Sequence, residues 1–366
     1  MKIQVRKPYF PNSSRISIHN EIENLLKSGR LTLGPKVKKL EKDFSRFLGV
    51  KYAVAVSSAT AGLHLSLLSL DIGNDDEVIV PAKTFISTAN SALFCNAKPI
   101  FVDVEESTFQ LDPKKLEKAI TKKTKAVMPV HLGGNVCNMK EILKITKQYN
   151  LKVVEDAAHA HGSKFCNKYA GTFGDLGVFS FYPDKVMASS DGGIIVTNNK
   201  KLYNKLLLLR NVGRAEIGKY DYTEIGYNYR MNEIQAVLAL EQLKILPHIL
   251  KIRREIAKKY NEVFTNHPNI EIQKISENVE SSYYAYVVKV KKGNFNQFRK
   301  KLLKNGIETS PMFQTVYKTK IYKKIFKNLK ICKISEDLDD KTFSIPLHPG
   351  LTKKEIDYII KHSKSS

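Results

Sequence analysis

The sequence has no tryptophan, few cysteines and no long apolar run. Its cysteines form no Cys-x-x-Cys pair, which argues against a disulfide framework and a thiolate metal cage and suits a reducing compartment. Apolar runs such as residues 206–209 fall far short of the ~18 residues that a membrane-spanning helix requires. Residues 1–8 lack the apolar core of a signal peptide, so we expect a cytoplasmic protein that does not enter a membrane. The four cysteines are Cys95, Cys137, Cys166 and Cys332.

Acidic residues are also in short supply. The chain carries 36 Asp and Glu against 60 Lys and Arg, a formal net charge of +24. Such a charge creates a field that favours anionic partners, and nucleic acid is one of them. However, the lysines are dispersed in pairs along the chain and form no concentrated basic arm. This dispersal favours a solvated lysine-rich surface over nucleic-acid binding.

What the chain does contain is typical of a folded protein. It has 366 residues, of which 42% are hydrophobic and 26% charged. At roughly 150 residues per domain, this length predicts two or three domains with a sizeable core. The composition excludes disorder for most of the length.

Hydrophobic periodicity indicates an α/β domain. Two amphipathic helices are expected first, at 18–28 and 37–48. Short apolar runs then alternate with helical segments, which is the pattern of a mainly parallel, buried sheet covered by helices. The expected strands are 52–56, 78–81, 99–102, 126–130 and 153–155, and the expected helices between them are 63–70, 113–120 and 139–149.

The second half of the chain changes character. Two further strand-like runs, 177–182 and 193–197, have no helix-length insert between them, so we expect a functional loop there. From Met231 a helical pattern continues until Pro247, where we expect a break, and then resumes from Ile249 to Tyr260. Beyond it the pattern indicates a smaller α+β unit. We therefore expect a large domain at residues 1–246 and a small one at 247–366.

Polar residues after the strand-like runs carry the functional information, because ligands of open parallel sheets bind beyond the carboxyl ends of the strands. Four segments stand out. They are Ser57–Gly62, Pro81–Phe85, Glu155–His161, and Ser180–Lys185 with the nearby Gly192–Gly193.

Each segment has an ordinary interpretation when taken separately. Ser57–Gly62 leads into a helix start that suits an anion, although a simple Ser/Thr cap is the favoured interpretation of this segment in isolation. Phe85 could belong to the core or stack on a flat cofactor. His159 and His161 follow two carboxylates, but this spacing without a third cluster argues against a metal. Lys185 would normally be a surface residue.

Together, the four segments supply the parts of a pyridoxal phosphate site. A lysine forms a Schiff base with the cofactor aldehyde. A carboxylate beside the ring nitrogen keeps it protonated, so that the ring can accept electrons when a carbon acid loses its proton. Amides and hydroxyls hold the phosphate.

With these motifs in order, the sequence resembles the sugar aminotransferases of the DegT/DnrJ/EryC1/StrS family, which are fold type I pyridoxal phosphate enzymes. The resemblance covers nearly the whole chain and rests on several independent motifs. They are Gly29–Pro35, Ser57–Gly62, Pro81–Phe85, Glu155–His159, Gly171–Asp175, Ser180–Lys185, Gly226–Met231 and Pro346–Gly350.

The resemblance implies a role for individual residues. Lys185 would be the Schiff-base lysine, Asp156 the partner of the ring nitrogen, and His159 a neighbour of the phenolic oxygen. Phe85 would stack on the ring. The implied phosphate contacts are Ser58, Ala59, Thr60 and Ser180, with Asn228 reaching the neighbouring subunit of a homodimer. The implied substrate contacts are Lys83, Arg30 and Arg230.

The chain departs from the family pattern in two places. Ala59 stands where the phosphate loop commonly has Gly, which changes little because an amide binds the phosphate. Met312 and Phe313 stand where many members carry a polar or His side chain, which bears on the substrate pocket.

The resemblance implies an aminotransferase that moves nitrogen from an amino acid, expected to be glutamate, to a 3-keto or 4-keto hexose linked to a nucleotide. Three alternatives remain open. One is amination of a ketocyclitol. Another is dehydration of a keto sugar, but there the family replaces the lysine by His, so Lys185 argues against it. The third is a non-catalytic basic binding or regulatory protein on the same scaffold.

Overall fold

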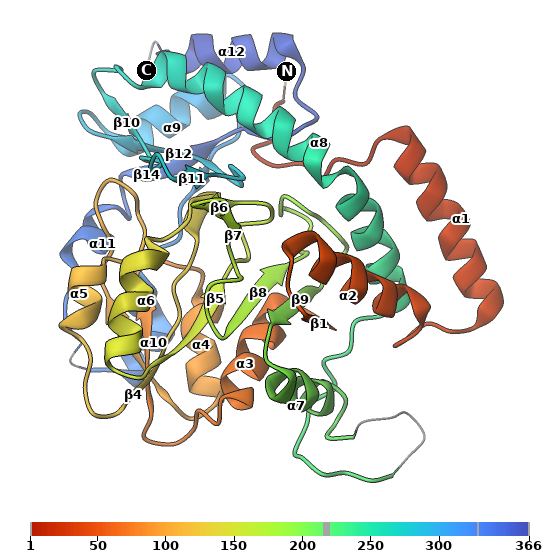
Figure 1. The fold of residues 1–366 in the computed structure, drawn as a ribbon. Helices are drawn as coiled ribbons and strands as arrows, with labels where there is room; N and C mark the ends of the chain where they lie inside the picture. Colours follow the sequence, from red (N-terminus) through yellow and green to blue (C-terminus); the bar gives the residue numbers. More distant parts are fainter. Residues whose placement is uncertain (1, 215–219, 328, 365–366) are drawn as a thin grey trace.

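The computed structural model describes residues 2–214, 220–327 and 329–364. Two sheets organise this part of the chain, one in its first two thirds and one near its C-terminus (Figure 1). A third, three-stranded sheet is formed by short strands: β6 (Lys164–Phe165), β7 (Lys168–Tyr169) and β11 (Val279–Glu280).

The large sheet has seven strands in the order β1-β9-β8-β5-β4-β2-β3. Neighbours from β8 to β3 run parallel, whereas β9 is antiparallel to both β1 and β8. The expected mainly parallel, mixed sheet is therefore confirmed. Its strands are β1 (Tyr52–Val56), β2 (Glu77–Pro81), β3 (Lys98–Val102), β4 (Thr124–Val127), β5 (Lys152–Asp156), β8 (Leu176–Ser180) and β9 (Gly193–Thr197).

Helices cover both faces of this sheet and bury an apolar core on each. On one face pack α3 (Ala59–Ser69), α4 (Ile86–Phe94) and α7 (Lys200–Arg210). On the other pack α2 (Pro35–Leu48), α5 (Pro113–Glu117), α6 (Met139–Gln148) and part of α8 (Glu233–Phe264). The buried side chains of α2, such as Val37, Leu40 and Phe44, keep helical spacing, which is why this face was readable from the sequence. Helix α4 and helix α7 were not expected.

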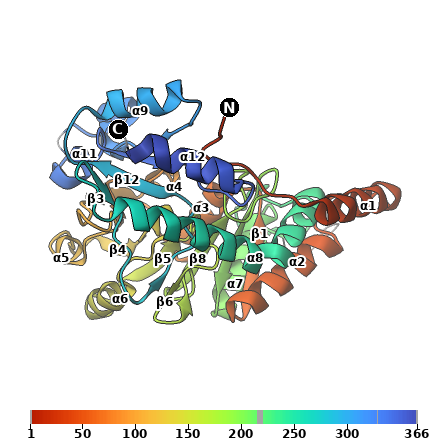
Figure 2. The same cartoon turned by 90° about the horizontal axis from the view of Figure 1, so that it is seen from above.

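The small sheet has the order β10-β12-β14-β13 and a core of its own. Figure 2 shows α8 and α12 beside it, and the two helices contact each other. The N-terminal segment joins this unit, because Ile3 pairs with Ile307 and is buried in its core. The elements are β10 (Ile270–Ile272), β12 (Tyr286–Val290), β13 (Ser310–Pro311), β14 (Thr342–Ile345), α9 (Phe295–Lys304) and α12 (Lys353–Lys364). Between β13 and β14, α10 (Lys320–Ile325) and α11 (Lys333–Asp337) pack against the large sheet's cores instead.

Helix α8 corrects one expectation. It runs for 32 residues through Pro247, so the expected break is wrong. Proline removes one helical hydrogen bond, but Leu246, Ile249 and Leu250 are buried around it, and this packing holds the helix together. A division at 246/247 would cut this helix in two, so we propose the two domains as sheet-centred units that share α8.

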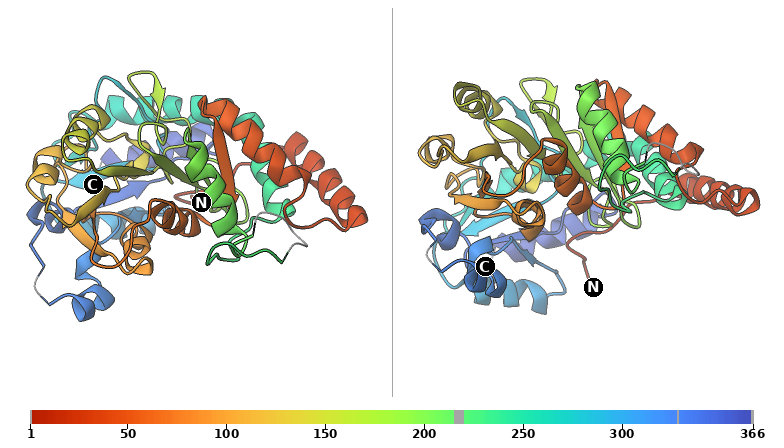
Figure 3. Two further views of the ribbon diagram at one scale, coloured as in Figure 1. Left: turned by 60° about the horizontal axis from the view of Figure 1, so that its bottom comes forward. Right: turned by 90° about the horizontal axis from the view of Figure 1, so that it is seen from below.

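The N-terminal helix α1 (Asn12–Ser28) lies apart from both sheets. It packs along α8 and extends away from the body of the molecule, as the red helix in Figure 3 shows. Ile16 and Leu26 on it are more than half exposed in this single chain.

Candidate functional site

A cavity of about 390 Å³ lies where β5 and β8 end and α3 and α4 begin. Arg6 of the N-terminal segment and Tyr284, just before β12, close it from the side of the small sheet. Its lining residues include, from the expected set, Ser58, Ala59, Thr60, Phe85, Asp156, His159, Ser180 and Lys185, and in addition Arg6, Thr84, Ser87, Tyr182, Asp184, Asp191, Tyr284 and Phe313. The four strand-end segments therefore meet at one place.

The start of α3 forms one wall. The hydroxyl of Ser58 accepts a hydrogen bond from Ala61 N–H, 3.1 Å, which caps the helix. The amides of Ala59 and Thr60 belong to the first turn, where a helix leaves N–H groups without intrahelical partners and favours negative charge. A Cβ at Gly193 would lie 2.7 Å from the nitrogen of Ala59, so only glycine lets the strand pass this close. This geometry suits a phosphate.

Asp156 ends β5 at the floor of the cavity. One carboxylate oxygen accepts from Thr88 Oγ1 at 2.8 Å and the other from Ala158 N–H at 3.2 Å. Burial raises the pKa of Asp156, and these two hydrogen bonds oppose the rise. A protonated ring nitrogen beside it would supply the cationic partner that a buried carboxylate requires.

His159 is buried against an aromatic ring. Its imidazole stacks on Tyr284 with ring centroids 3.9 Å apart and lies 5.7 Å from Phe313. Burial holds the pKa of His159 well below its usual range, so the ring is neutral at pH 7. Gly133 N–H donates to Nδ1, 3.4 Å, which leaves the proton on Nε2. His159 can therefore donate one hydrogen bond from Nε2.

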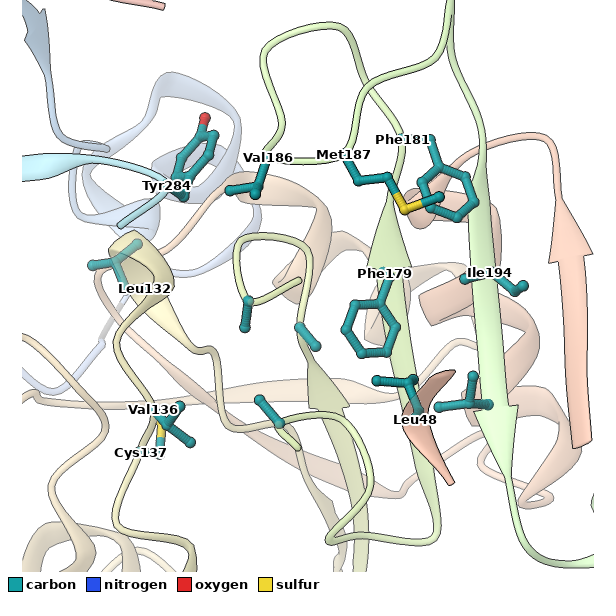
Figure 4. Packing of buried hydrophobic residues seen from close by; sticks show 14 of the residues in the cluster. Leu48, Leu132, Val136, Cys137, Phe179, Phe181, Val186, Met187, Ile194 and Tyr284 are labelled. Atoms are coloured by element: carbon teal, nitrogen blue, oxygen red, sulfur yellow. The ribbon is translucent and has the colours of Figure 1, made fainter. Parts of the chain in front are cut away.

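Lys185 lies on the loop between β8 and β9. The next two residues, Val186 and Met187, are buried beside Phe181 and anchor this loop in the core (Figure 4). The Lys185 amine lies 3.4 Å from the hydroxyl of Tyr284 and 3.3 Å from Asp184. Burial lowers the pKa of Lys185, and the charge of Asp184 opposes this. A lowered amine pKa favours the neutral, nucleophilic form.

A buried layer supports the floor of the cavity. Glu155 accepts hydrogen bonds from three backbone amides at 2.6–2.8 Å, those of Gly171, Phe173 and Gly174. His131 Nε2 lies 2.9 Å from the same carboxylate. This satisfied network fixes the backbone next to Asp156 without reaching the cavity.

The comparisons with known proteins agree with this geometry. The model of the DegT/DnrJ/EryC1/StrS aminotransferase family matches residues 13–363. The chain belongs to this family. It is 36% identical over 334 residues to GDP-perosamine synthase of Caulobacter vibrioides, which covers 90% of this chain and 89% of that one.

Solved structures add the cofactor. The putative sugar aminotransferase Spr1654 of Streptococcus pneumoniae in its PLP form superposes with a TM-score of 0.92 at 30% identity, over 100% of this chain and 98% of that one. A mutant of GDP-4-keto-6-deoxymannose-3-dehydratase (ColD) with bound GDP-perosamine superposes with a TM-score of 0.92 at 28% identity, over 99% of this chain and 100% of that one. This family member is thus a fold type I aminotransferase, and its cofactor is pyridoxal phosphate.

Lys83 requires a correction. It is only 1% exposed, and its amine donates to the carbonyl of Phe313 at 2.9 Å and to Asp339 at 3.1 Å. It does not line the cavity. The position after a strand end was expected to place this amine near the substrate, but the carboxylate of Asp339 holds it in the interior.

Three further expected residues lie away from this chain's cavity. Asn228 and Arg30 are exposed, and Arg230 donates to Asn211 Oδ1 at 3.0 Å. Burial lowers the pKa of Arg230, with the charges of Arg214 and Arg210 acting in the same direction.

Sequence reasoning missed Arg6, Asp184 and Tyr284. Tyr284 donates to Asp184 at 2.7 Å, and the guanidinium of Arg6 lies 4.7 Å from the centre of its ring. Asp184 adjoins Lys185, which was a usable signal. Arg6 and Tyr284 come from the two ends of the chain and form no local motif. Phe313, noted as an apolar departure, does line the cavity, 5.5 Å from Phe85 between ring centroids.

Proposed function

We propose that this aminotransferase transfers the amino group of glutamate to the keto carbon of a nucleotide-linked 3-keto or 4-keto hexose. The observation that carries the proposal is the meeting of Lys185, Asp156 and His159 in one cavity with the start of α3. The names of its relatives support the sugar. One is a GDP-perosamine synthase, and the structure of ColD contains GDP-perosamine.

We assign each residue of the cavity a role in holding the cofactor according to its position. The amides of Ala59 and Thr60 and the hydroxyl of Ser180 hold the cofactor phosphate. Asp156 holds the proton of the ring nitrogen, and Phe85 covers one face of the ring. Bound in this way, the cofactor supplies an electron sink for the carbon that loses a proton.

Lys185 has two tasks. Its amine would hold the cofactor through the aldehyde, and when free it would be placed to take up or give a proton at the reacting carbon. The loop anchored by Val186 and Met187 limits where this amine can go. The Tyr284 hydroxyl lies close enough to accept a hydrogen bond from it. Nε2 of His159 donates to the phenolic oxygen.

Dehydration would require a histidine at position 185, where this chain has Lys185, so the lysine argues against the dehydratase alternative. The ketocyclitol alternative uses the same cofactor residues and differs only in the acceptor. A non-catalytic binding protein would leave the neutral His159 and the depressed pKa of Lys185 without a use.

We also propose a homodimer with shared sites. The segment that carries Asn228 and Arg230 is fastened to its own subunit by a bridge between Asn211 and Asn228, yet the Asn228 side chain is exposed. In a shared site, mixing Lys185→Ala protein with Asn228→Ala protein would regenerate a site free of both changes and restore activity. Full activity of a monomer in sedimentation would contradict the proposal.

The acceptor is tested by comparing substrates that differ only in the nucleotide. A nucleotide-linked keto-hexose should exceed the matching free ketose in kcat/KM by at least roughly a hundredfold, or ~3 kcal/mol, because binding energy from the diphosphate orients the reacting carbon. The amino sugar is measured by mass spectrometry. Equal rates on the free ketose or on a ketocyclitol would support the aminocyclitol alternative and leave the cofactor residues as proposed.

A further inference from the structure

Arg6 is a basic side chain in the cofactor cavity that the roles above leave unused. The backbone around it is tied to the small sheet, since Ile3 N–H donates to the carbonyl of Gly306 at 2.7 Å and Leu347 N–H donates to Val5 at 3.3 Å. These bonds fix the segment just before Arg6. Its side chain lines the cavity together with Lys185, Asp184 and Tyr284.

The guanidinium of Arg6 is positioned but only partly used. Nη2 donates to Ser344 Oγ at 3.1 Å, and Nη1 lies 3.5 Å from Asp184 Oδ2, a distance typical of a loose ion pair. Nε is buried and has no hydrogen-bond partner among the described residues. A guanidinium has five N–H donors, so Arg6 retains the capacity to bind another anion.

The lining of the cavity offers few cations that could bind an anion. Within the described parts of the chain, Arg6 and Lys185 are the only lysine or arginine side chains in the lining, against three carboxylates, those of Asp156, Asp184 and Asp191. An amino-acid donor brings a carboxylate into this cavity. When Lys185 is attached to the cofactor, Arg6 is the lysine or arginine of this lining that remains to receive it.

The place of Arg6 in the cavity indicates which anion it binds, the carboxylate of an amino acid or the diphosphate of a nucleotide-linked sugar. Asp184 contacts both cations, because Nη1 of Arg6 lies 3.5 Å from its Oδ2 and the amine of Lys185 lies 3.3 Å from its Oδ1. An amino acid carries its carboxylate on the reacting carbon itself, whereas a whole hexose ring separates a diphosphate from the sugar's keto carbon. A cation this close to the reacting amine therefore matches the carboxylate.

We propose that Arg6 binds the α-carboxylate of the amino-acid donor. Asp184 and the face of Tyr284 hold the guanidinium in place, and the incoming carboxylate takes its spare donors. This inference rests on the proposed transamination, but it concerns only the half-reaction with the amino acid.

The test measures the two half-reactions separately, glutamate with enzyme loaded with pyridoxal phosphate and the keto sugar with enzyme loaded with pyridoxamine phosphate. Arg6→Gln should raise the L-glutamate concentration for half-maximal rate at least about tenfold, because a charge-assisted, bidentate contact is lost. The L-glutamate concentration for half-maximal rate in Arg6→Lys should lie between those of the wild type and Arg6→Gln, since an ammonium keeps the charge but cannot bind a carboxylate through two parallel N–H groups. The half-reaction with a nucleotide-linked keto-hexose should change less than about twofold.

Two controls isolate the carboxylate. Arg46→Gln removes a highly exposed arginine on α2, outside the cavity, and should leave both half-reactions unchanged. A simple alkylamine lacks a carboxylate, so its slow reaction with the loaded enzyme should be the same in wild type and Arg6→Gln. The absorbance of the loaded enzyme reports whether the variant still holds its cofactor.

The outcomes are distinct. A loss confined to the sugar half-reaction would assign Arg6 to the diphosphate and overturn the inference. An equal loss for glutamate and the alkylamine would make Arg6 a support for Lys185, and an unchanged response to glutamate would place the carboxylate elsewhere. Each of these two results would also overturn the inference that Arg6 binds the donor carboxylate. Failure of the wild-type protein to react with any keto sugar, while reacting normally with glutamate, would count against the proposed acceptor and leave Arg6 testable.

Discussion

Two lysines with largely buried side chains follow strand ends of the same sheet, and they differ in what surrounds the amine. Lys83 comes after β2 and Lys185 after β8, burial lowers the pKa of both, and each lies near an aspartate. The amine of Lys83 has two hydrogen-bond acceptors within 3.1 Å, whereas the amine of Lys185 has only longer contacts, 3.4 Å to the Tyr284 hydroxyl and 3.3 Å to Asp184.

The difference separates a structural lysine from a chemical one. A buried ion pair whose amine is hydrogen-bonded crosslinks two elements, here the loop after β2 and the segment of Asp339. A poorly satisfied amine that lines a cavity is free to react. Burial and a depressed pKa are common to both, so the accessible, under-bonded amine is the decisive feature.

The largest expected effect follows from Lys185→Ala. Turnover should fall by at least roughly a thousandfold, because attachment to the cofactor and proton transfer are lost together. The fold should persist, since the side chain satisfies no buried group fully. Borohydride reduction of the wild-type holoenzyme followed by peptide mapping should place the pyridoxyl group on Lys185. Labelling of Lys83 instead would reverse the comparison.

Asp156→Ala should come next, with turnover reduced roughly a hundredfold or more, because the proton on the ring nitrogen is no longer held. Thermal unfolding should change little, since removing a carboxylate that burial disfavours also removes its desolvation cost. Asp156→Asn is the matched control for shape. Near-normal turnover in the alanine variant would contradict the role.

Lys83→Met should show the opposite profile. Removing the amine leaves the carboxylate of Asp339 buried, and breaking such a pair typically costs about 3 kcal/mol of unfolding free energy. Because Lys83 does not line the cavity, the folded variant should keep its cofactor absorbance and most of its turnover. In Lys83→Met with Asp339→Leu, part of the stability should return. Loss of activity at unchanged stability would restore Lys83 as a substrate contact.

Much of the fold could be predicted because its signals are local. The alternating apolar runs predicted β2 as 78–81, and it is Glu77–Pro81. Helix α4 was not predicted because its segment, Ile86–Phe94, is rich in serine, threonine and alanine and lacks a strong apolar stripe. At Pro247 the local rule was correct about the lost hydrogen bond, but packing on both sides outweighed it.

The residues of the site also fall into two groups, those that local sequence signals predicted and those that only the tertiary fold brings to the cavity. Lys185, Asp156 and the start of α3 lie in short segments after strands, where the sequence signals position and chemistry together. Arg6 and Tyr284 approach Lys185 only through the tertiary fold. Lys83 shares the local signal of Lys185, and only the distant Asp339 shows that its amine is already bonded.

A smaller test applies the same comparison to two histidines of one segment. Burial lowers the pKa of His161 to about 3, and the charges of Lys185 and Arg253 act in the same direction; its ring packs against Phe179 and Phe181. His159 is also neutral but lines the cavity. His161 should therefore matter for stability and His159 for turnover.

The pH dependence of unfolding checks this. The unfolded chain protonates His161 near pH 6.5 and the native protein only near pH 3, so its contribution is full above pH 6.5 and is lost as the pH falls toward 3. Between pH 7 and pH 5 the wild type should lose on the order of 2 kcal/mol more than His161→Phe, measured by urea unfolding of both proteins. His159→Phe should instead reduce turnover at pH 7. Parallel stability profiles of the wild type and His161→Phe would show that His161 is protonated in the native protein, and the contrast between the two histidines would then fail.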